Sequence, residues 1–357
     1  MKIEPLRIGD LVARLPIIQG GMGVGVSLSG LASAVARAGG IGLISTAFPG
    51  YDEPDFRTNL LESNIRALKK HIKKARENAN GGVIGINAMV AISNYEDYVK
   101  AAVEEGIDLV VSGAGLPRNL PELVEGSNTK IAPIISSAKG VRVILKLWDR
   151  NYNKTADLVV VEGPKAGGHL GFKKDEVFSS FETFDDEIPK ILEEIKIYEE
   201  KYNKKIPLVV AGGVFTGEDI AKYLKMGASG VQMATRFVAT EECDAHENFK
   251  KAYLKTNGDD ITLVKSPVGM PGRALRNDFV KRTEEGNVKV DKCYRCILPC
   301  NPATTPYCIS DALIRAVEGD VETGLVFCGA NAGRVEKIVP VKELMDELEQ
   351  ELLSIPE

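Results

Sequence analysis

The sequence predicts an α/β fold, a TIM (β/α)8 barrel with an inserted smaller lobe near the C-terminus. Short apolar runs alternate with longer amphipathic stretches along most of the chain, which is typical of a parallel sheet with right-handed crossovers. The runs contain few polar side chains, as expected of strands that are buried on both faces. The 357 residues exceed the roughly 250 of a typical barrel, which leaves room for a lobe.

The expected strands and helices follow one another in strict alternation. We expect strands at Pro16–Ile18, Ile41–Ser45, Val83–Ala88, Leu109–Ser112, Lys130–Ile135, Leu158–Glu162, Leu208–Ala211 and Val231–Met233. We expect helices at Ser29–Ala38, Asp55–Asn78, Tyr95–Glu105, Pro121–Glu125, Ser137–Asp149, Asp186–Tyr202, Thr216–Met226 and Ala245–Thr256. Eight such units favour closure into a barrel, and an open, doubly wound sheet is the alternative.

Several helix ends have recognisable signals. Ser29 is of a residue type that caps helix N-termini, and Thr216 followed by Asp219 resembles a capping box. Gly106 and Gly227 each follow an expected helix, where a left-handed residue is common. These signals support the positions of three of the expected helices.

The alternation ends near residue 240, which suggests three regions. We expect a barrel at 1–240, a cap or substrate lobe at 241–320, and a helical segment at 321–357 that packs back on the barrel. Residues 264–277 contain prolines and glycines and are expected to form an irregular loop over the barrel mouth.

Composition narrows the function classes. A net charge of −5 without a basic cluster argues against a nucleic-acid partner. No run of about 18 apolar residues occurs, so no membrane span is expected. The stretch Met1–Pro5 lacks a signal-peptide core, which makes the cytoplasm the expected compartment.

Four of the six cysteines are crowded in a C-x2-C-x3-C-x7-C pattern. Four thiolates could hold zinc or an iron–sulfur cluster, although the spacing matches no standard template. We expect no metal and interpret the cluster as reduced thiols, as is usual in a reducing compartment. The candidate ligands of the alternative are Cys293, Cys296, Cys300 and Cys308.

Glycines and amide side chains gather where the expected strands end, which is where barrels of this type bind their ligands. Adjacent glycines expose backbone N–H groups to a planar or anionic ligand. The loops after strands seven and eight are the usual phosphate site. The candidate binding residues at these ends are Gly20, Gly21, Met22, Asn87, Gly212, Gly213, Gln232, Met233, Ala234 and Thr235.

The sixth strand runs into the most informative loop. Glu162 ends this strand, and Gly167 and Gly168 precede His169. An imidazole with an ordinary pKa near 6.5 is mostly neutral at pH 7 and can act as a base. We therefore expect His169 to be catalytic, with the glycines allowing a flat ligand to approach the backbone. The other two histidines, His71 and His246, lie among charged residues and are expected to be solvated.

Together these segments resemble the nitronate monooxygenase family, formerly called 2-nitropropane dioxygenases, and share motifs with the flavin-dependent enoyl-acyl-carrier-protein reductases. The resemblance rests on Gln19–Met22, Gly85–Asn87, Glu162–Gly171, Ala211–Gly213 and Gln232–Phe237. It implies a TIM barrel holding FMN non-covalently. Asn87 and the Gly20–Met22 backbone would contact the ring, and Glu162, Gly167 and Gly168 would lie beside it. Gly212, Gly213 and Gln232–Thr235 would bind the phosphate and ribityl chain, with His169 near the flavin.

The resemblance implies an oxidoreductase that oxidises alkyl nitronates with O2 to a carbonyl compound and nitrite. The first alternative is an NAD(P)H-dependent enoyl-acyl-carrier-protein reductase, so the substrate is a small nitronate or an enoyl thioester. The second is a flavin-free barrel isomerase of phosphorylated substrates, and the third is a cysteine-rich sensor on a degenerate barrel. A homodimer is compatible with the sequence.

Overall fold

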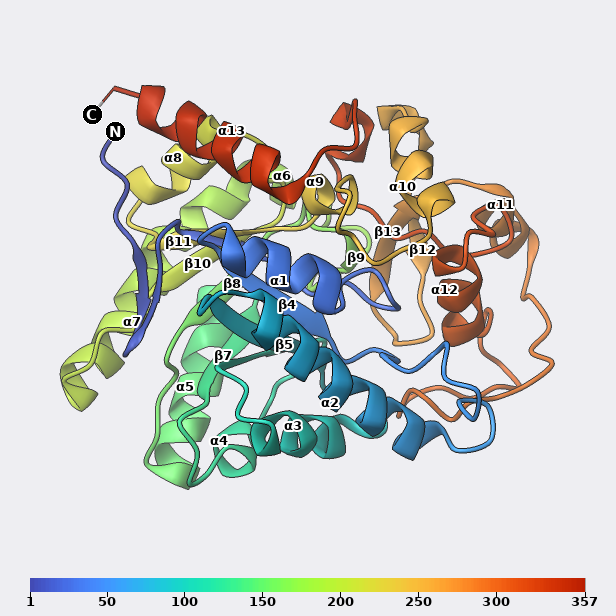
Figure 1. Ribbon diagram of the computed structural model, residues 1–357, viewed down its shortest axis with the longest axis horizontal. Helices are drawn as coiled ribbons and strands as arrows, with labels where there is room; N and C mark the ends of the chain where they lie inside the picture. Colours follow the sequence, from blue (N-terminus) through green and yellow to red (C-terminus); the bar gives the residue numbers. More distant parts are fainter. Residues whose placement is uncertain (357) are drawn as a thin grey trace.

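The computed structural model describes residues 1–356 and contains a closed barrel of eight parallel strands (Figure 1). The order around the barrel is β10-β11-β3-β4-β5-β6-β7-β8. The fold prediction is confirmed, because each expected strand is present with ends that differ by at most a residue. The barrel strands are β3 (Ile17–Gln19), β4 (Ile41–Ser45), β5 (Val83–Met89), β6 (Leu109–Gly113), β7 (Lys130–Ile135), β8 (Val159–Glu162), β10 (Leu208–Ala211) and β11 (Gly230–Met233).

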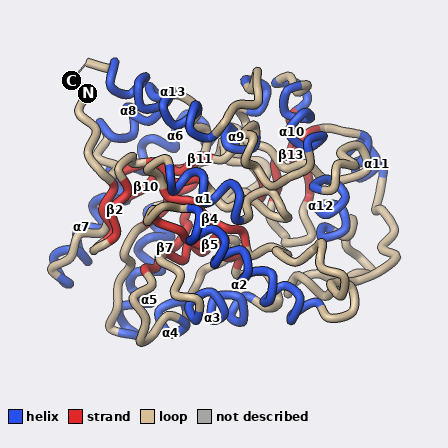
Figure 2. Tube along the Cα trace, viewed as in Figure 1, coloured by secondary structure: helices blue, strands red, loops and turns tan. Residues whose placement is uncertain are grey.

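Helices surround this barrel (Figures 1 and 2). Those that alternate with the strands are α1 (Ser29–Arg37), α2 (Leu60–Asn78), α3 (Tyr95–Glu104), α4 (Leu120–Leu123), α5 (Ala138–Tyr152), α7 (Glu187–Tyr202) and α8 (Gly217–Lys225). The last helix, α13 (Val341–Ser354), packs against α8 and α1, and the two chain ends lie close together (Figure 1). Within residues 1–356, no helix combines the length and the apolar character that a bilayer span requires.

The barrel interior is filled by apolar side chains that point inward from the strands. Ile18, Leu43, Val111 and Val160 belong to this inner cluster and are fully buried. The cluster also includes Leu6 and other residues of a short antiparallel hairpin, β1 (Leu6–Ile8) and β2 (Leu11–Ala13). This hairpin precedes the first barrel strand and packs on the core, so the ligand-binding end of the barrel is the opposite one.

The segment after residue 240 forms a second small sheet, which corrects the expectation of an irregular loop at 264–277. Strands β12 (Ile261–Lys265) and β13 (Pro271–Leu275) form a hairpin, and β13 pairs with β9 (Gly168–His169). Local sequence patterns do not predict this sheet, because β13 pairs with β9, which lies about 100 residues earlier in the chain. The division of the chain at residues 240 and 320 stays a prediction.

The remaining elements lie mostly around this sheet and over the barrel mouth (Figure 1). They are α6 (Ser180–Thr183), α9 (Thr235–Val238), α10 (Glu247–Leu254), α11 (Asp278–Glu285) and α12 (Ile309–Val317), with 3-10 turns at Phe184–Asp186, Gly258–Asp260 and Ala332–Arg334. Helix α2 begins at Leu60 rather than at Asp55, because residues 55–59 form a turn in which the Asn59 N–H donates to the Asp55 carbonyl.

The capping predictions have mixed outcomes. Thr216 and Asp219 form the expected capping box, and Gly106 and Gly227 adopt positive φ angles of 69° and 99°. Ser29 does not cap α1. The Asp244 carboxylate does so instead, accepting hydrogen bonds from the N–H groups of Leu28, Gly30 and Leu31. A carboxylate delivered from more than 200 residues away leaves no local trace in the sequence.

We therefore expect Asp244→Ala to lower the free energy of unfolding by about 1–2 kcal/mol, the usual cost of losing a helix cap. Urea unfolding followed by circular dichroism measures this difference. Asp244→Asn is the matched control, since its amide oxygen still accepts a hydrogen bond and its loss should be smaller. Equal stability of Asp244→Ala and the unaltered protein would contradict the capping role.

Candidate functional site

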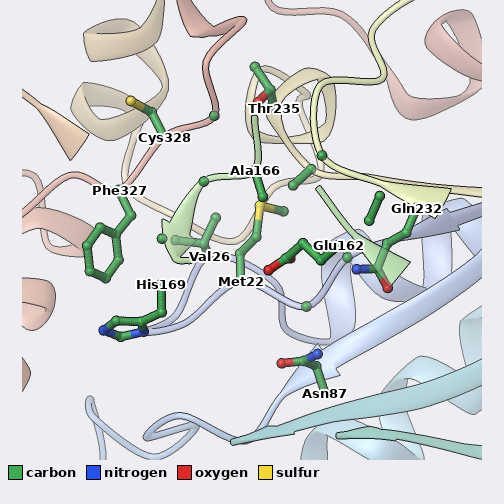
Figure 3. Close-up of a pocket in the computed structure, with 18 of the residues that line it drawn as sticks. Met22, Val26, Asn87, Glu162, Ala166, His169, Gln232, Thr235, Phe327 and Cys328 are labelled. Carbon is green, nitrogen blue, oxygen red and sulfur yellow. The ribbon is translucent and has the colours of Figure 1, made fainter. Parts of the chain in front are cut away.

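A cavity opens at the C-terminal ends of the barrel strands, and it is also lined by His169 of β9 and by Phe249 and Tyr253 of α10. Figure 3 places His169 and Phe327 on one side of it and Gln232 on the other, with Glu162 and Met22 between them. The structure brings together at this cavity every residue that the sequence analysis selected as a catalytic or cofactor-binding candidate. These are Gly20, Gly21, Met22, Asn87, Glu162, Gly167, Gly168, His169, Gly212, Gly213, Gln232, Met233, Ala234 and Thr235.

The first loop and the third barrel strand meet at a close contact. A Cβ added to Gly21 would overlap the Cβ of Asn87, so only glycine allows the loop to lie there. The Asn87 side chain makes no hydrogen bond within residues 1–356 and faces the cavity. A half-buried amide without a partner can donate and accept at once, as recognition of a heterocycle requires.

The loop after β10 depends on two glycines with positive φ. Gly212 and Gly213 both have a φ of 91°. An added Cβ would lie 2.8 Å from the Gly163 carbonyl oxygen at Gly212 and 2.9 Å from the Lys165 Cβ at Gly213. In the described chain their N–H groups donate no hydrogen bond, and Asn331 fixes the turn by donating to the Gly213 carbonyl at 2.6 Å. The turn therefore presents free N–H groups at the cavity.

The end of the neighbouring strand β11 adds a buried acceptor. Gln232 is 8% exposed, and its Oε1 has no hydrogen-bond partner within residues 1–356. A buried amide oxygen without a partner is costly unless a ligand or water satisfies it. Arg236, which follows this strand, forms an ion pair of 2.9 Å with Glu347 of α13 and does not line the cavity.

His169 is held by the second sheet rather than by the barrel. It pairs with Gly272 of β13, and its ring packs edge-on against Phe327 with the centroids 5.1 Å apart. Its Nε2 lies 2.7 Å from the hydroxyl of Ser266, and the Val268 N–H donates to the same hydroxyl. Burial lowers the pKa of His169 to about 4. The imidazole is therefore neutral at pH 7, with Nδ1 as the nitrogen left for a ligand.

Glu162 faces the cavity without a partner. Its carboxyl group makes no hydrogen bond or ion pair with residues 1–356, and burial raises its pKa to about 8. The carboxyl group is consequently mostly protonated at pH 7, so it can donate a hydrogen bond. The sequence identified this residue but gave no indication of its protonation state.

Arg273 clamps the loop between Glu162 and His169. It is 2% exposed, and its Nη1 donates to the carbonyls of Pro164, at 2.8 Å, and Ala166. Its guanidinium lies over the ring of Phe181, 5.6 Å from the centroid. No carboxylate pairs with it in the described part of the chain, so this buried cation is balanced only by carbonyl dipoles and an aromatic face. Sequence analysis missed this residue.

One wall of the cavity was also missed. It is apolar and comes from the segment after residue 240, where α10 and α12 present one face each. The only available signal was the helical spacing of aromatic residues on α10, which fits an ordinary core equally well. The residues of this wall are Phe249, Tyr253, Leu313, Phe327 and Cys328.

The four crowded cysteines do not line the cavity. They lie in a stretch without helix or strand between α11 and α12, residues 286–308, which we call the cysteine loop. All six cysteines are free thiols. His246 is exposed, as expected, whereas His71 is half-buried and hydrogen-bonded to Ser29 at 3.0 Å, which corrects its prediction as a solvated residue.

A family model shows the family to which the chain belongs, and individual relatives carry several names. The family model for nitronate monooxygenase matches residues 6–351. A probable nitronate monooxygenase of Bacillus subtilis is 24% identical over 373 residues, which cover 95% of this chain and 96% of that protein. A (3aS,4S,5R,7aS)-5-hydroxy-7a-methyl-1-oxo-octahydro-1H-indene-4-carboxyl-CoA dehydrogenase of Mycobacterium tuberculosis is 28% identical over 272 residues, 76% of this chain and 66% of that protein. The match thus spans about two thirds of that dehydrogenase.

Solved structures resemble the chain over nearly its whole length. FabK from Thermotoga maritima is 28% identical with a TM-score of 0.72, and the match covers 95% of this chain and 92% of that one. Nitroalkane oxidase from Streptomyces ansochromogenes is 21% identical with a TM-score of 0.73 and 96% coverage of both chains. At that identity, the second likeness supports the fold alone.

The state of Glu162 predicts how stability depends on pH. Between about pH 4.5 and 8 the folded protein keeps a proton on this carboxyl that the unfolded chain has released, so stability falls as pH rises. His169 acts in the opposite sense only between about pH 4 and 6.5. From pH 6.5 to 8 we therefore expect Glu162 to lower stability by up to about 1.4 kcal/mol per pH unit.

Thermal unfolding of protein stripped of bound small molecules tests this prediction. The decline between pH 6.5 and 8 should be weaker in Glu162→Gln, whose side chain does not titrate. Asp219→Asn, in the capping box of α8, would change stability without removing the slope. Parallel pH curves for Glu162→Gln and the unaltered protein would show that Glu162 is already ionised at neutral pH.

Proposed function

Because the chain belongs to the nitronate monooxygenase family, which is one of oxidoreductases, we propose that it is FMN-dependent and oxidises alkyl nitronates with O2 to a carbonyl compound and nitrite. The observation that carries this proposal is a cavity at the barrel mouth that joins unpaired polar groups on one side to a neutral His169 on the other.

The residues of the cavity fit FMN. The unpaired Gln232 Oε1 can accept a hydrogen bond from it, and the free N–H groups of Gly212 and Gly213 suit a phosphate. The close contact of Gly21 with Asn87 leaves a surface without side-chain bulk beside the unpaired Asn87 amide, which suits the flat ring of FMN. When bound, FMN supplies the electron transfer for which protein side chains have no equivalent.

The chain's own residues would control charge and protons. Since Nε2 of His169 is engaged by Ser266, Nδ1 is the atom that exchanges a proton with a substrate. In one tautomer Nδ1 accepts a proton from the carbon of a neutral nitroalkane, and in the other it donates a hydrogen bond to a nitronate oxygen. A protonated Glu162 avoids repelling an anionic nitronate. The apolar wall excludes water from this end of the cavity.

Enoyl reduction is the second candidate function. The similarity to FabK and to the mycobacterial CoA dehydrogenase favours it, and the wall of Phe249, Tyr253 and Leu313 offers apolar contacts to an acyl chain. In that reaction NAD(P)H would be the electron donor and His169 would supply a proton. A flavin-free isomerase is the weaker alternative, because the family is one of oxidoreductases.

Side-by-side assays separate these functions. We expect the purified protein to release FMN on denaturation and to consume O2 with propionate 3-nitronate. His169→Ala should lower kcat by about a hundredfold or more while FMN content is unchanged. NAD(P)H oxidation with a crotonyl thioester, without nitronate-dependent O2 uptake, would move the assignment to enoyl reductase. A protein that binds no added FMN would contradict both.

The contact between Ser266 and His169 gives a separate prediction. Ser266→Ala removes the hydrogen bond that orients the ring, so we expect kcat to fall roughly ten- to a hundredfold with little change in KM. The pH profile of kcat should also shift, because the hydrogen bond helps to set the proton affinity of the ring. Ser266→Thr keeps the hydroxyl and should restore most of the rate. Loss of activity in both variants, with unshifted profiles, would mean that Ser266 has only a packing role.

A further inference from the structure

Lys165 contributes the one lysine or arginine side chain among the residues that line the cavity, as far as residues 1–356 describe it. It lies in the loop between β8 and β9, three residues after Glu162. Burial lowers the pKa of His169 and raises that of Glu162, so both groups are largely neutral near pH 7. Burial also raises the pKa values of the Tyr253 and Cys328 side chains. Lys165 is therefore the main charge that a ligand meets in this cavity.

The stem of Lys165 packs against the turn whose N–H groups are free. A Cβ added to Gly213 would lie 2.9 Å from the Cβ of Lys165 and 3.0 Å from its Cδ. The Lys165 carbonyl accepts a hydrogen bond from the Ala330 N–H at 3.1 Å, which fixes the backbone of the lysine. Since Cε alone separates the ammonium group from Cδ, the cation lies close to the turn. Glycine at position 213 thus lets a cation lie next to the free N–H groups of Gly212 and Gly213.

The Thr235 hydroxyl belongs to the same corner of the cavity. A Cβ added to Gly329 would lie 2.6 Å from the Thr235 Oγ1 and 3.6 Å from the Lys165 carbonyl oxygen. All three residues line the cavity. Backbone N–H groups, hydroxyl groups and ammonium groups are the donors that proteins use to bind phosphate. The segments after the neighbouring strands β8, β10 and β11 therefore supply phosphate donors to one corner.

Two cations lie near this corner without a carboxylate partner. The Lys165 Nζ lies 5.4 Å from the centroid of the Phe181 ring, and the guanidinium of Arg273 lies 5.6 Å from the same centroid. In the described part of the chain neither side chain forms an ion pair, and the Nη2 of the buried Arg273 has no hydrogen-bond partner. A buried, unpaired cation beside a second one favours an anionic ligand, because the anion offsets the cost of burying positive charge.

We propose that Lys165 binds the phosphate of FMN and makes the cavity select FMN over riboflavin, which lacks that phosphate. The inference rests on the proposed function, because it takes FMN as the ligand. The lysine provides a point charge on a flexible stem, while the N–H groups of Gly212 and Gly213 provide fixed donors. Since Lys165 is exposed at the rim of the cavity, its attraction for the phosphate depends on ionic strength. The competing interpretation is a solvated lysine that only covers Phe181.

Flavin titration of the full chain, freed of bound small molecules, tests the proposal through the fluorescence of FMN and of riboflavin. Lys165→Met keeps a stem of similar length and loses the charge. In this variant we expect the Kd for FMN to rise about tenfold at low ionic strength, while the Kd for riboflavin stays nearly unchanged. Added salt should weaken FMN binding more in the unaltered protein than in the variant. Lys165→Arg keeps the charge and should retain most of the preference for FMN.

Lys205→Met is the matched control for net charge, because Lys205 precedes β10 at the end of the barrel away from the cavity and its side chain is 92% exposed. It should leave both affinities unchanged. Equal weakening of FMN and riboflavin binding in Lys165→Met would mean that the lysine only positions its loop. An unchanged FMN affinity would mean that it is merely solvated. Either result overturns the inference while the proposed function stands, whereas a chain that binds neither flavin contradicts both.

Discussion

The pairing of β9 with β13 is the constraint on which the site depends. A two-residue strand, Gly168–His169, could not hold its own conformation. The hairpin of β12 and β13 gives it a partner and, in the same contact, brings Ser266 to the imidazole and Arg273 to the carbonyls of the preceding loop. The barrel supplies the position of the cavity, while the hairpin supplies the orientation of the residue expected to be catalytic.

Whereas the hairpin anchors side chains at one wall of the cavity, glycines keep the remaining wall free of side chains. At Gly21 and Gly212 the neighbouring atoms leave no room for a Cβ, so these positions are fixed by packing as well as by any ligand. The unpaired polar groups at Gln232 and Asn87 then remain accessible from the cavity. Glycines leave one side of the cavity without side chains, and the hairpin anchors His169 on the other side. The cavity therefore has distinct polar and apolar ends.

The barrel could be predicted because its information is local. Runs such as Val159–Glu162 are apolar on both faces and recur at regular intervals, and strand ends indicate where a barrel binds its ligand. For the same reason the sequence identified the residues that line the cavity from the barrel side. It could not identify Arg273, Ser266 or Phe327, because their importance arises from contacts with residues about 100 or more positions away. The helix cap of Asp244 was missed for the same physical reason.

Burial also determines the charge of the cavity. The same desolvation raises the pKa of Glu162 and lowers that of His169, so each group favours its neutral form near pH 7. Two neutral groups that can both donate and accept protons suit an anionic substrate better than a fixed ion pair does. A buried ion pair would be costly to desolvate, and its negative member would repel the substrate. Backbone N–H groups at Gly212 and Gly213 add attraction for an anion without a titratable charge. The cavity is therefore suited to bind negative charge through oriented dipoles and to move a proton through His169.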